Sequence, residues 1–234
     1  MTVLNDLVDR LKNDQDPIGA LRGVILLSGL LRNAAQNSVA EDLTLVGPED
    51  WQGWTGRIVD GGGERPAAIA QVRKAKTGEN SFKGYIADYT QGQITSTRIG
   101  ADAQFCFTIT MNGCTFGIGS QAGAADTMLV SHGNASNTTA NPNNIPKGLQ
   151  QATTVALQTA TQYAWARDLH GQGATVIEPE HYRMNASNCT TMGYRAAGQR
   201  WAFFTQRWVK SGSVYTSYGL ENASTNSITP HNGV

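Results

Sequence analysis

Three cysteines and four histidines are the side chains of this chain best suited to nucleophilic and acid–base chemistry. Cys114 is the most informative, because it follows an Asn-Gly pair in the stretch FTITMNGCTFGIG. Its type fits a small buried hydrophobe, half of a disulfide, or a nucleophile. Three cysteines cannot all pair with one another, so at least one thiol stays outside a disulfide. Cys106, within a strand pattern, and Cys189, in a polar stretch, are interpreted as structural.

A histidine follows Cys114 at a spacing that a hairpin could exploit. The segments CTFGIG and DTMLVSH read as two strands joined by a loop of small residues, and if Ser120 lies opposite Asp126, then Cys114 lies opposite His132. Side chains directly opposite on antiparallel strands have β-carbons about 4.5–5.5 Å apart. The sequence therefore predicts a thiol and an imidazole that share a proton and form a thiolate–imidazolium pair.

A catalytic imidazole needs a third group to orient its ring, and Thr108 is the candidate. In the strand pattern AQFCFTITM the odd positions are apolar and the even positions, Thr108 included, are small or polar, which predicts one packed face and one polar face. Six residues of straight strand span roughly 20 Å, so Thr108 can approach Cys114 only if the chain bends widely at Asn112 and Gly113. Backbone N–H groups of Asn112 and Gly113 at this turn are candidate oxyanion donors.

The remaining pattern predicts an α+β chain of one domain over residues 1–234, in which antiparallel strands outnumber helices. Residues 1–40 are expected to be helical, with a second helix that starts at Asp16 and Pro17 and buries Ile18, Leu21, Ile25 and Leu30. From residue 41 short apolar runs between Gly and Pro predict a β-rich catalytic core, which contains one long helix over about 147–170.

Charge and composition argue against several classes of partner. Eighteen basic residues balance eighteen acidic ones, so no long-range field attracts nucleic acid or an anionic membrane. The apolar stretch from Gly23 to Leu31 is about half of what a membrane span needs, and the first residues do not resemble a Sec-type signal peptide. His170 and His181 lack metal-ligand spacing with the cysteines, so neither a metal nor another cofactor is expected.

Thr108, Cys114 and His132 together resemble the catalytic pattern of the cytotoxic necrotizing factor domain and the Burkholderia lethal factor, and also that of bacterial chemoreceptor glutamine deamidases. The resemblance covers about 30 residues, Phe105 to Asn134, with Asn-Gly-Cys where the family has Ser-Gly-Cys. It implies a two-sheet, mostly antiparallel β-sandwich with outer helices. It also implies a secreted virulence toxin or effector that deamidates one glutamine of a protein in the cytosol of a host or target cell, a small GTPase or a translation factor in the family.

The implied reaction is acyl transfer through a thioester on Cys114, with catalytic residues Cys114, His132 and Thr108. Water as the second acceptor gives a deamidase, and a primary amine gives a transglutaminase. A papain-like protease would use the same Cys-His pair. From another class, a catalytically inert β-rich binding module could present the loop HGNASNTTANPNN, residues 132–144, to a partner.

Overall fold

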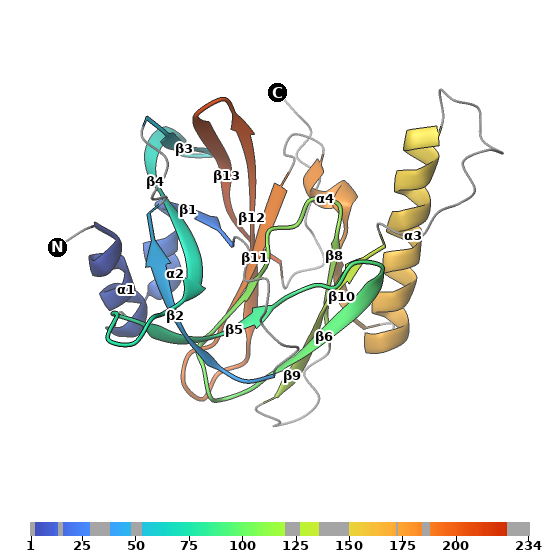
Figure 1. Cartoon of the computed structure of the whole chain (residues 1–234), viewed down its shortest axis with the longest axis horizontal. Coiled ribbons are helices and arrows are strands. Elements are labelled where there is room, and N and C mark those ends of the chain that lie inside the picture. Colours follow the sequence, from blue (N-terminus) through green and yellow to red (C-terminus); the bar gives the residue numbers. More distant parts are fainter. Residues whose placement is uncertain are drawn as a thin grey trace.

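A computed structural model describes residues 3–13, 16–28, 38–47, 53–119, 127–135, 150–171, 173–183 and 188–223. The chain forms a β-barrel, a smaller sheet beside it and four helices within these residues (Figure 1). None of the described helices is long and apolar enough to cross a membrane. Leu30 and residues 136–144 of the predicted presenting loop lie outside the described residues.

Eight strands close the barrel, because its first and last members pair with each other. Around the ring they run β4 (Gly63–Lys74), β2 (Glu41–Val46), β5 (Phe82–Ala87), β7 (Phe105–Thr108), β11 (Asn188–Tyr194), β12 (Ala202–Ser211), β13 (Val214–Asn222) and β3 (Thr55–Asp60). The 12-residue β4 makes closure possible: its first half pairs with β3 and its second half with β2. The pairs β5–β7 and β13–β3 are parallel, and the other neighbours in the ring are antiparallel.

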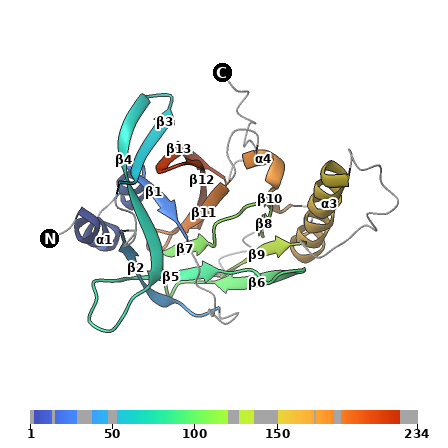
Figure 2. The ribbon, with the colours of Figure 1, turned by 45° about the horizontal axis from the view of Figure 1, so that its top comes forward.

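A ninth strand, β1 (Val24–Leu27), pairs in parallel with β4 and is buried on both faces (Figure 2). The side chain of Gln206 takes the place of a second neighbouring strand. Its amide nitrogen donates to the carbonyl of Val24 at 2.7 Å, and its oxygen accepts the N–H of Leu26 at 2.7 Å. Buried backbone groups need such partners. The predicted helix through Ile25 is therefore wrong beyond α2 (Pro17–Leu21), because an apolar run without a polar face fits a doubly buried strand.

The smaller sheet contains β10 (Thr175–Ile177), β8 (Thr115–Ile118), β9 (Met128–Asn134) and β6 (Gln93–Ile99) in that order, all antiparallel. Its inner face packs on the outside of the barrel through a shared core that includes Phe116, Val130 and Phe203. Its outer face carries α3 (Gln150–His170), the long helix predicted from the sequence (Figure 1).

Two short elements complete the described chain. The helix α1 (Val3–Asn13) packs with α2 against a hydrophobic core to which β2, β4 and β7 also contribute. We call it the first core. The five-residue helix α4 (Pro179–Arg183) lies between β10 and β11 in the chain and contributes Tyr182 to the core below the smaller sheet.

The predicted fold class, an α+β two-sheet sandwich that is mostly antiparallel with outer helices, is wrong. The protein is mostly β, with a closed eight-stranded mixed barrel, a small antiparallel sheet and few helices. Strand patterns identify strands but not their neighbours, and the closure of β3 onto β4 and the parallel pairs join segments that are far apart in sequence.

The strand that carries Thr108 also differs from its expected environment. Phe105 and Phe107 belong to the first core, and Cys106 belongs to the core under the smaller sheet. All four residues of β7 are buried, so neither face of this strand is exposed to solvent. The alternation of large and small residues along this strand therefore arises because its two faces pack into two different hydrophobic cores.

Candidate active site

The candidate site lies where the chain leaves the barrel and enters the smaller sheet. After β7 the chain pairs briefly with β11 through Met111 and Cys189 and then turns at Asn112 and Gly113. Gly113 has a φ of +99°, which an L side chain would strain. The wide bend that the site requires is therefore present, and β7 does not pair with β8.

The register of the β8–β9 hairpin differs by two residues from the prediction. Phe116 lies opposite His132 and Thr115 opposite Gly133, which places Cys114 beside Asn134. A shift of two residues preserves the face of each side chain. Cys114 and His132 thus share the inner face of the smaller sheet as diagonal neighbours, for which Cα atoms lie about 7–8 Å apart. The prediction that the two residues lie directly opposite each other is wrong, and the prediction that they lie on one face of the sheet is confirmed.

Cys114 is buried, with 4% of its surface exposed, and none of the three cysteines forms a disulfide. The side-chain amide of Asn134 donates to its sulfur at 3.3 Å. An amide donor stabilises negative charge on sulfur, or on an oxygen that forms next to it. Cys106 and Cys189 have no such role, since burial raises the pKa of each thiol to about 12.

His132 is completely buried and has one ring nitrogen without a partner. Its Nδ1 lies 3.3 Å from the carbonyl oxygen of Ala87, which can only accept, so Nδ1 carries the proton. Its Nε2 then carries a lone pair, and this atom has no hydrogen-bond partner among the described residues. Burial lowers the pKa of His132 to about 4, and the ring of Tyr89 lies against it with centroids 5.2 Å apart. The imidazole is neutral at pH 7, so the resting pair is not the predicted thiolate–imidazolium ion pair.

The hydroxyl of Thr108 does not orient the imidazole. Its hydroxyl accepts the backbone N–H of Thr191 at 2.9 Å, and it is almost fully buried in the barrel wall. Its strand partner Ala87 supplies the orienting group instead, through the carbonyl on His132. The prediction thus identified the right part of the barrel but not the atom.

The turn before Cys114 is held by hydrogen bonds from two other elements. The Tyr182 hydroxyl accepts the N–H of Gly113 at 2.9 Å and donates to the carbonyl of Cys114 at 2.7 Å. The side chain of Gln162, on α3, donates to the carbonyl of Gly113 at 3.1 Å. The N–H of Gly113, predicted as an oxyanion donor, is therefore already committed to Tyr182. Asn112 lies exposed at the outer side of the turn.

A second imidazole pair lies on the opposite face of the smaller sheet. His170, at the end of α3, has its Nε2 2.7 Å from the hydroxyl of Ser131, within the geometry of a serine–histidine dyad. A Cβ added to Gly117 would lie 2.6 Å from the Ser131 hydroxyl and 2.8 Å from the His170 ring. The space beside the Ser131 hydroxyl is too small for one added carbon atom, so it is also too small for the carbonyl group of a substrate. This pair anchors α3 to the sheet.

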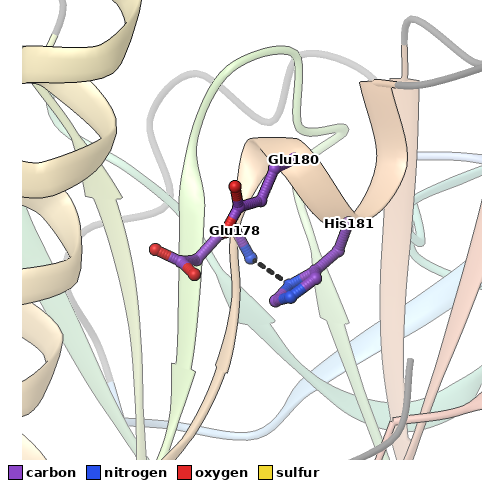
Figure 3. A group of neighbouring side chains, drawn as sticks. All are labelled: Glu178, Glu180 and His181. Atoms are coloured by element: carbon purple, nitrogen blue, oxygen red, sulfur yellow. Dashed lines mark hydrogen bonds between the residues drawn. The ribbon is translucent and has the colours of Figure 1, made fainter. Parts of the chain in front are cut away.

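Glu178, Glu180 and His181 form a cluster at the start of α4 (Figure 3). One potential ligand atom from each lies within 4.8 Å of the others. However, Nδ1 of His181 accepts the N–H of Glu178 at 3.0 Å, which leaves the proton of the neutral ring on Nε2. Neither nitrogen then offers a lone pair to a metal ion. The arrangement is a helix cap in which His181 replaces the usual Glu or Gln.

A polar hollow of about 400 Å³ lies at the β3–β4 turn and includes Gly61 and Gly62. Asp60, one of its two carboxylates, forms two 2.8 Å hydrogen bonds with Arg65, which lower the pKa of Asp60 to about 2. Asp60 therefore cannot donate a proton at neutral pH. The hollow contains no cysteine, serine or histidine among its lining residues.

The comparisons with known proteins add no assignment. No family model matches the chain, and no curated protein matches it.

Sequence reasoning missed Asn134, Tyr182, Gln162 and the Ala87 carbonyl. Asn134 could have been found, because it lies two residues after His132 and so shares its face. Tyr182 and Gln162 reach the turn from α4 and α3, and no local pattern connects those helices to Cys114.

Proposed function

We propose that this chain is a cysteine-dependent hydrolase of side-chain amides, acting as a protein glutamine deamidase with Cys114 as nucleophile and His132 as base. One observation carries the proposal: a buried imidazole whose tautomer is fixed by Ala87 has no partner for its Nε2 among the described residues, and it lies on the same face as the Cys114 thiol. A buried polar atom without a partner is costly, so its retention calls for a reason. Proton transfer during a reaction supplies one.

The proposed reaction begins when a substrate amide approaches the Cys114 sulfur. His132 Nε2 takes the thiol proton while the Cys114 sulfur bonds to the amide carbon, and the carbonyl electrons move onto oxygen. The amide of Asn134, now on the sulfur, lies close enough to donate to this oxyanion. The imidazolium then protonates the leaving nitrogen, and ammonia departs from a thioester.

Hydrolysis of the thioester uses the same base. His132 takes a proton from water, the resulting hydroxide adds to the thioester carbon, and the oxyanion collapses with loss of the thiolate, which regains its proton from the ring. The products are glutamate and the original enzyme. A primary amine in place of water would give transglutamination at the same site.

The burial of the site favours a side-chain amide over a peptide bond. Cys114 is 4% exposed and His132 is not exposed at all. A slender glutamine side chain can reach a recessed thiol, whereas a protease must align an extended backbone across its nucleophile. The papain-like alternative is less consistent with this geometry. A non-catalytic binding module gives no reason for an unpartnered Nε2 on His132.

The nature of the substrate is proposed from the resemblance over Phe105 to Asn134 alone. It suggests an effector whose target is a protein of another cell, with GTPases and translation factors as the first candidates to examine. The implied sandwich fold does not support this extension, because the fold is a barrel.

The test incubates the purified protein with a host-cell lysate and maps glutamine-to-glutamate conversion by mass spectrometry. Wild type and the control Ser131→Ala should convert the same sites, and Cys114→Ser should convert none. Chain cleavage in place of conversion would establish the protease. Conversion by Cys114→Ser at the wild-type rate would contradict the proposal.

A further inference from the structure

Tyr182 bridges the peptide groups on the two sides of the Gly113–Cys114 peptide. Its hydroxyl accepts the N–H of Gly113 and donates to the carbonyl of Cys114, so a single oxygen fixes the orientation of the chain on both sides of the Gly113–Cys114 bond. It is 1% exposed and packs in the same core as Cys114. Its position is thus fixed by packing before it fixes the turn.

The turn needs an external constraint because its own conformation is unusual. Gly113 has a φ of +99°. A glycine backbone can adopt more conformations than that of any other residue, so this angle must be held by contacts from outside the turn. Strand pairing does not begin until Thr115. Between the Met111 bridge and β8, the sulfur is therefore positioned by the contacts of Asn112–Cys114 rather than by a sheet.

A second contact acts on the Gly113–Cys114 peptide, which lies between the two groups that Tyr182 bridges, from the other side of the smaller sheet. Gln162 of α3 donates to the carbonyl of Gly113 at 3.1 Å, and its side chain lies over Gly133 at 3.6 Å from where a Cβ would be. With the two Tyr182 bonds, this makes three side-chain hydrogen bonds to the backbone of two consecutive residues. Ordinary strand residues receive theirs from a neighbouring strand.

We propose that Tyr182 is a positioning residue for the reaction of Cys114, with Gln162 as its weaker partner: they hold the turn so that the sulfur meets the Asn134 amide and the His132 lone pair. This rests on the proposed function of the site. Displacements of about 1 Å in such an arrangement cost on the order of 100-fold in rate.

The experiment measures alkylation of Cys114 by iodoacetamide from pH 5 to 9, with peptide mass spectrometry as the readout. Tyr182→Phe keeps the ring and removes the hydroxyl. The matched control is Tyr85→Phe, since the Tyr85 hydroxyl also accepts one backbone N–H, that of Gly100 at 3.1 Å, within the same core. Thermal unfolding of both variants measures how much stability each hydroxyl contributes.

We expect Tyr182→Phe to slow alkylation at pH 6 by about 10- to 100-fold, while Tyr85→Phe leaves it unchanged. A merely structural hydroxyl would change the unfolding temperature in both variants and the pH profile in neither. If Tyr182→Phe does not fold, Gln162→Met provides the test, with a smaller slowing expected.

The outcomes separate this inference from the function on which it rests. If His132→Phe slows the reaction at pH 6 but Tyr182→Phe and Gln162→Met leave it at the wild-type rate, the positioning role is overturned and the Cys–His assignment stands. If His132→Phe also leaves the rate unchanged, the proposed function itself fails.

Discussion

The two faces of the smaller sheet each carry a histidine beside a potential nucleophile, yet the two pairs differ in what they leave unsatisfied. On the outer face Ser131 and His170 are hydrogen-bonded and enclosed by Gly117 and α3. On the inner face His132 is oriented by Ala87 but keeps Nε2 without a partner among the described residues. Short distance alone would select the outer pair. On the proposed assignment, a lone pair without a described partner on the same face as a thiol is the better indication of chemistry.

The largest effect expected from this comparison is on activity. His132→Phe should lower glutamine conversion by about 10²–10⁴-fold, the usual contribution of a general base, whereas His170→Phe should change it only through stability. Phenylalanine fills the ring volume, and Ala87 keeps the N–H of Ile109 as a partner. Initial rates on an identified substrate measure both. Equal losses in the two variants would abolish the distinction between the faces.

The enclosure of the outer pair can be tested by adding one carbon atom. Gly117→Ala should lower the free energy of unfolding by about 1–3 kcal/mol, because its Cβ would meet Ser131 and His170 below 3.0 Å. Gly133→Ala is the matched control on the same face, where the nearest atom would be Gln162 at 3.6 Å. Urea unfolding of both variants gives the comparison. A Gly117→Ala protein as stable as Gly133→Ala would show that the outer pair has room for a substrate.

The buried imidazole on the inner face predicts a stability that depends on pH. The pKa of His132 is about 4 in the folded protein and near 6.5 in the unfolded chain, so the unfolded state binds more protons between these values. The free energy of unfolding should therefore fall as the pH drops from about 6.5 to 4, with a loss on the order of 2 kcal/mol at pH 5. Denaturant titrations at pH 7 and 5 measure it.

His132→Phe should lack most of this pH dependence. His170 and His181, whose pKa values are also lowered by burial, supply the remainder. A variant with the full wild-type dependence would mean that His132 is hydrated in solution.

The smallest effect concerns the cap of α4, where the titrating group is a carboxyl. Burial, with the charge of Glu180 second, raises the pKa of Glu178 to about 7. Stability from its protonated form is then present below about pH 4.5 and lost as the pH rises through 7. Because Glu178 is partly exposed, Glu178→Gln should gain less than about 1 kcal/mol over wild type at pH 8 and nothing at pH 4. A gain that is equal at both pH values would contradict this shift.

Local patterns predicted local features well. The long helix, the β8–β9 hairpin and the shared face of Cys114 and His132 all follow from residue types and alternation within about 30 residues. The exact register did not follow, since a loop of small residues can be closed at more than one position.

Contacts between distant segments could not be predicted in the same way. Barrel closure by β3 and β4, the Gln206 amide on β1 and the Tyr182 hydroxyl on the turn each join residues whose local sequence contains no sign of the partner. Thr108 shows the consequence, because its strand was placed near the site while its hydroxyl binds Thr191. The shared face of Cys114 and His132 was predictable, but the contacts that hold them were not.

The most direct test of the central claim is the pH dependence of Cys114 alkylation in the wild-type protein and in His132→Phe. An ordinary thiol, with a pKa about 8.5, reacts roughly tenfold more slowly for each unit below that value. With His132 as base, the wild-type rate should persist to about pH 5 and fall only as the imidazole is protonated, and His132→Phe should follow the ordinary thiol. Identical profiles in the two proteins would contradict the account.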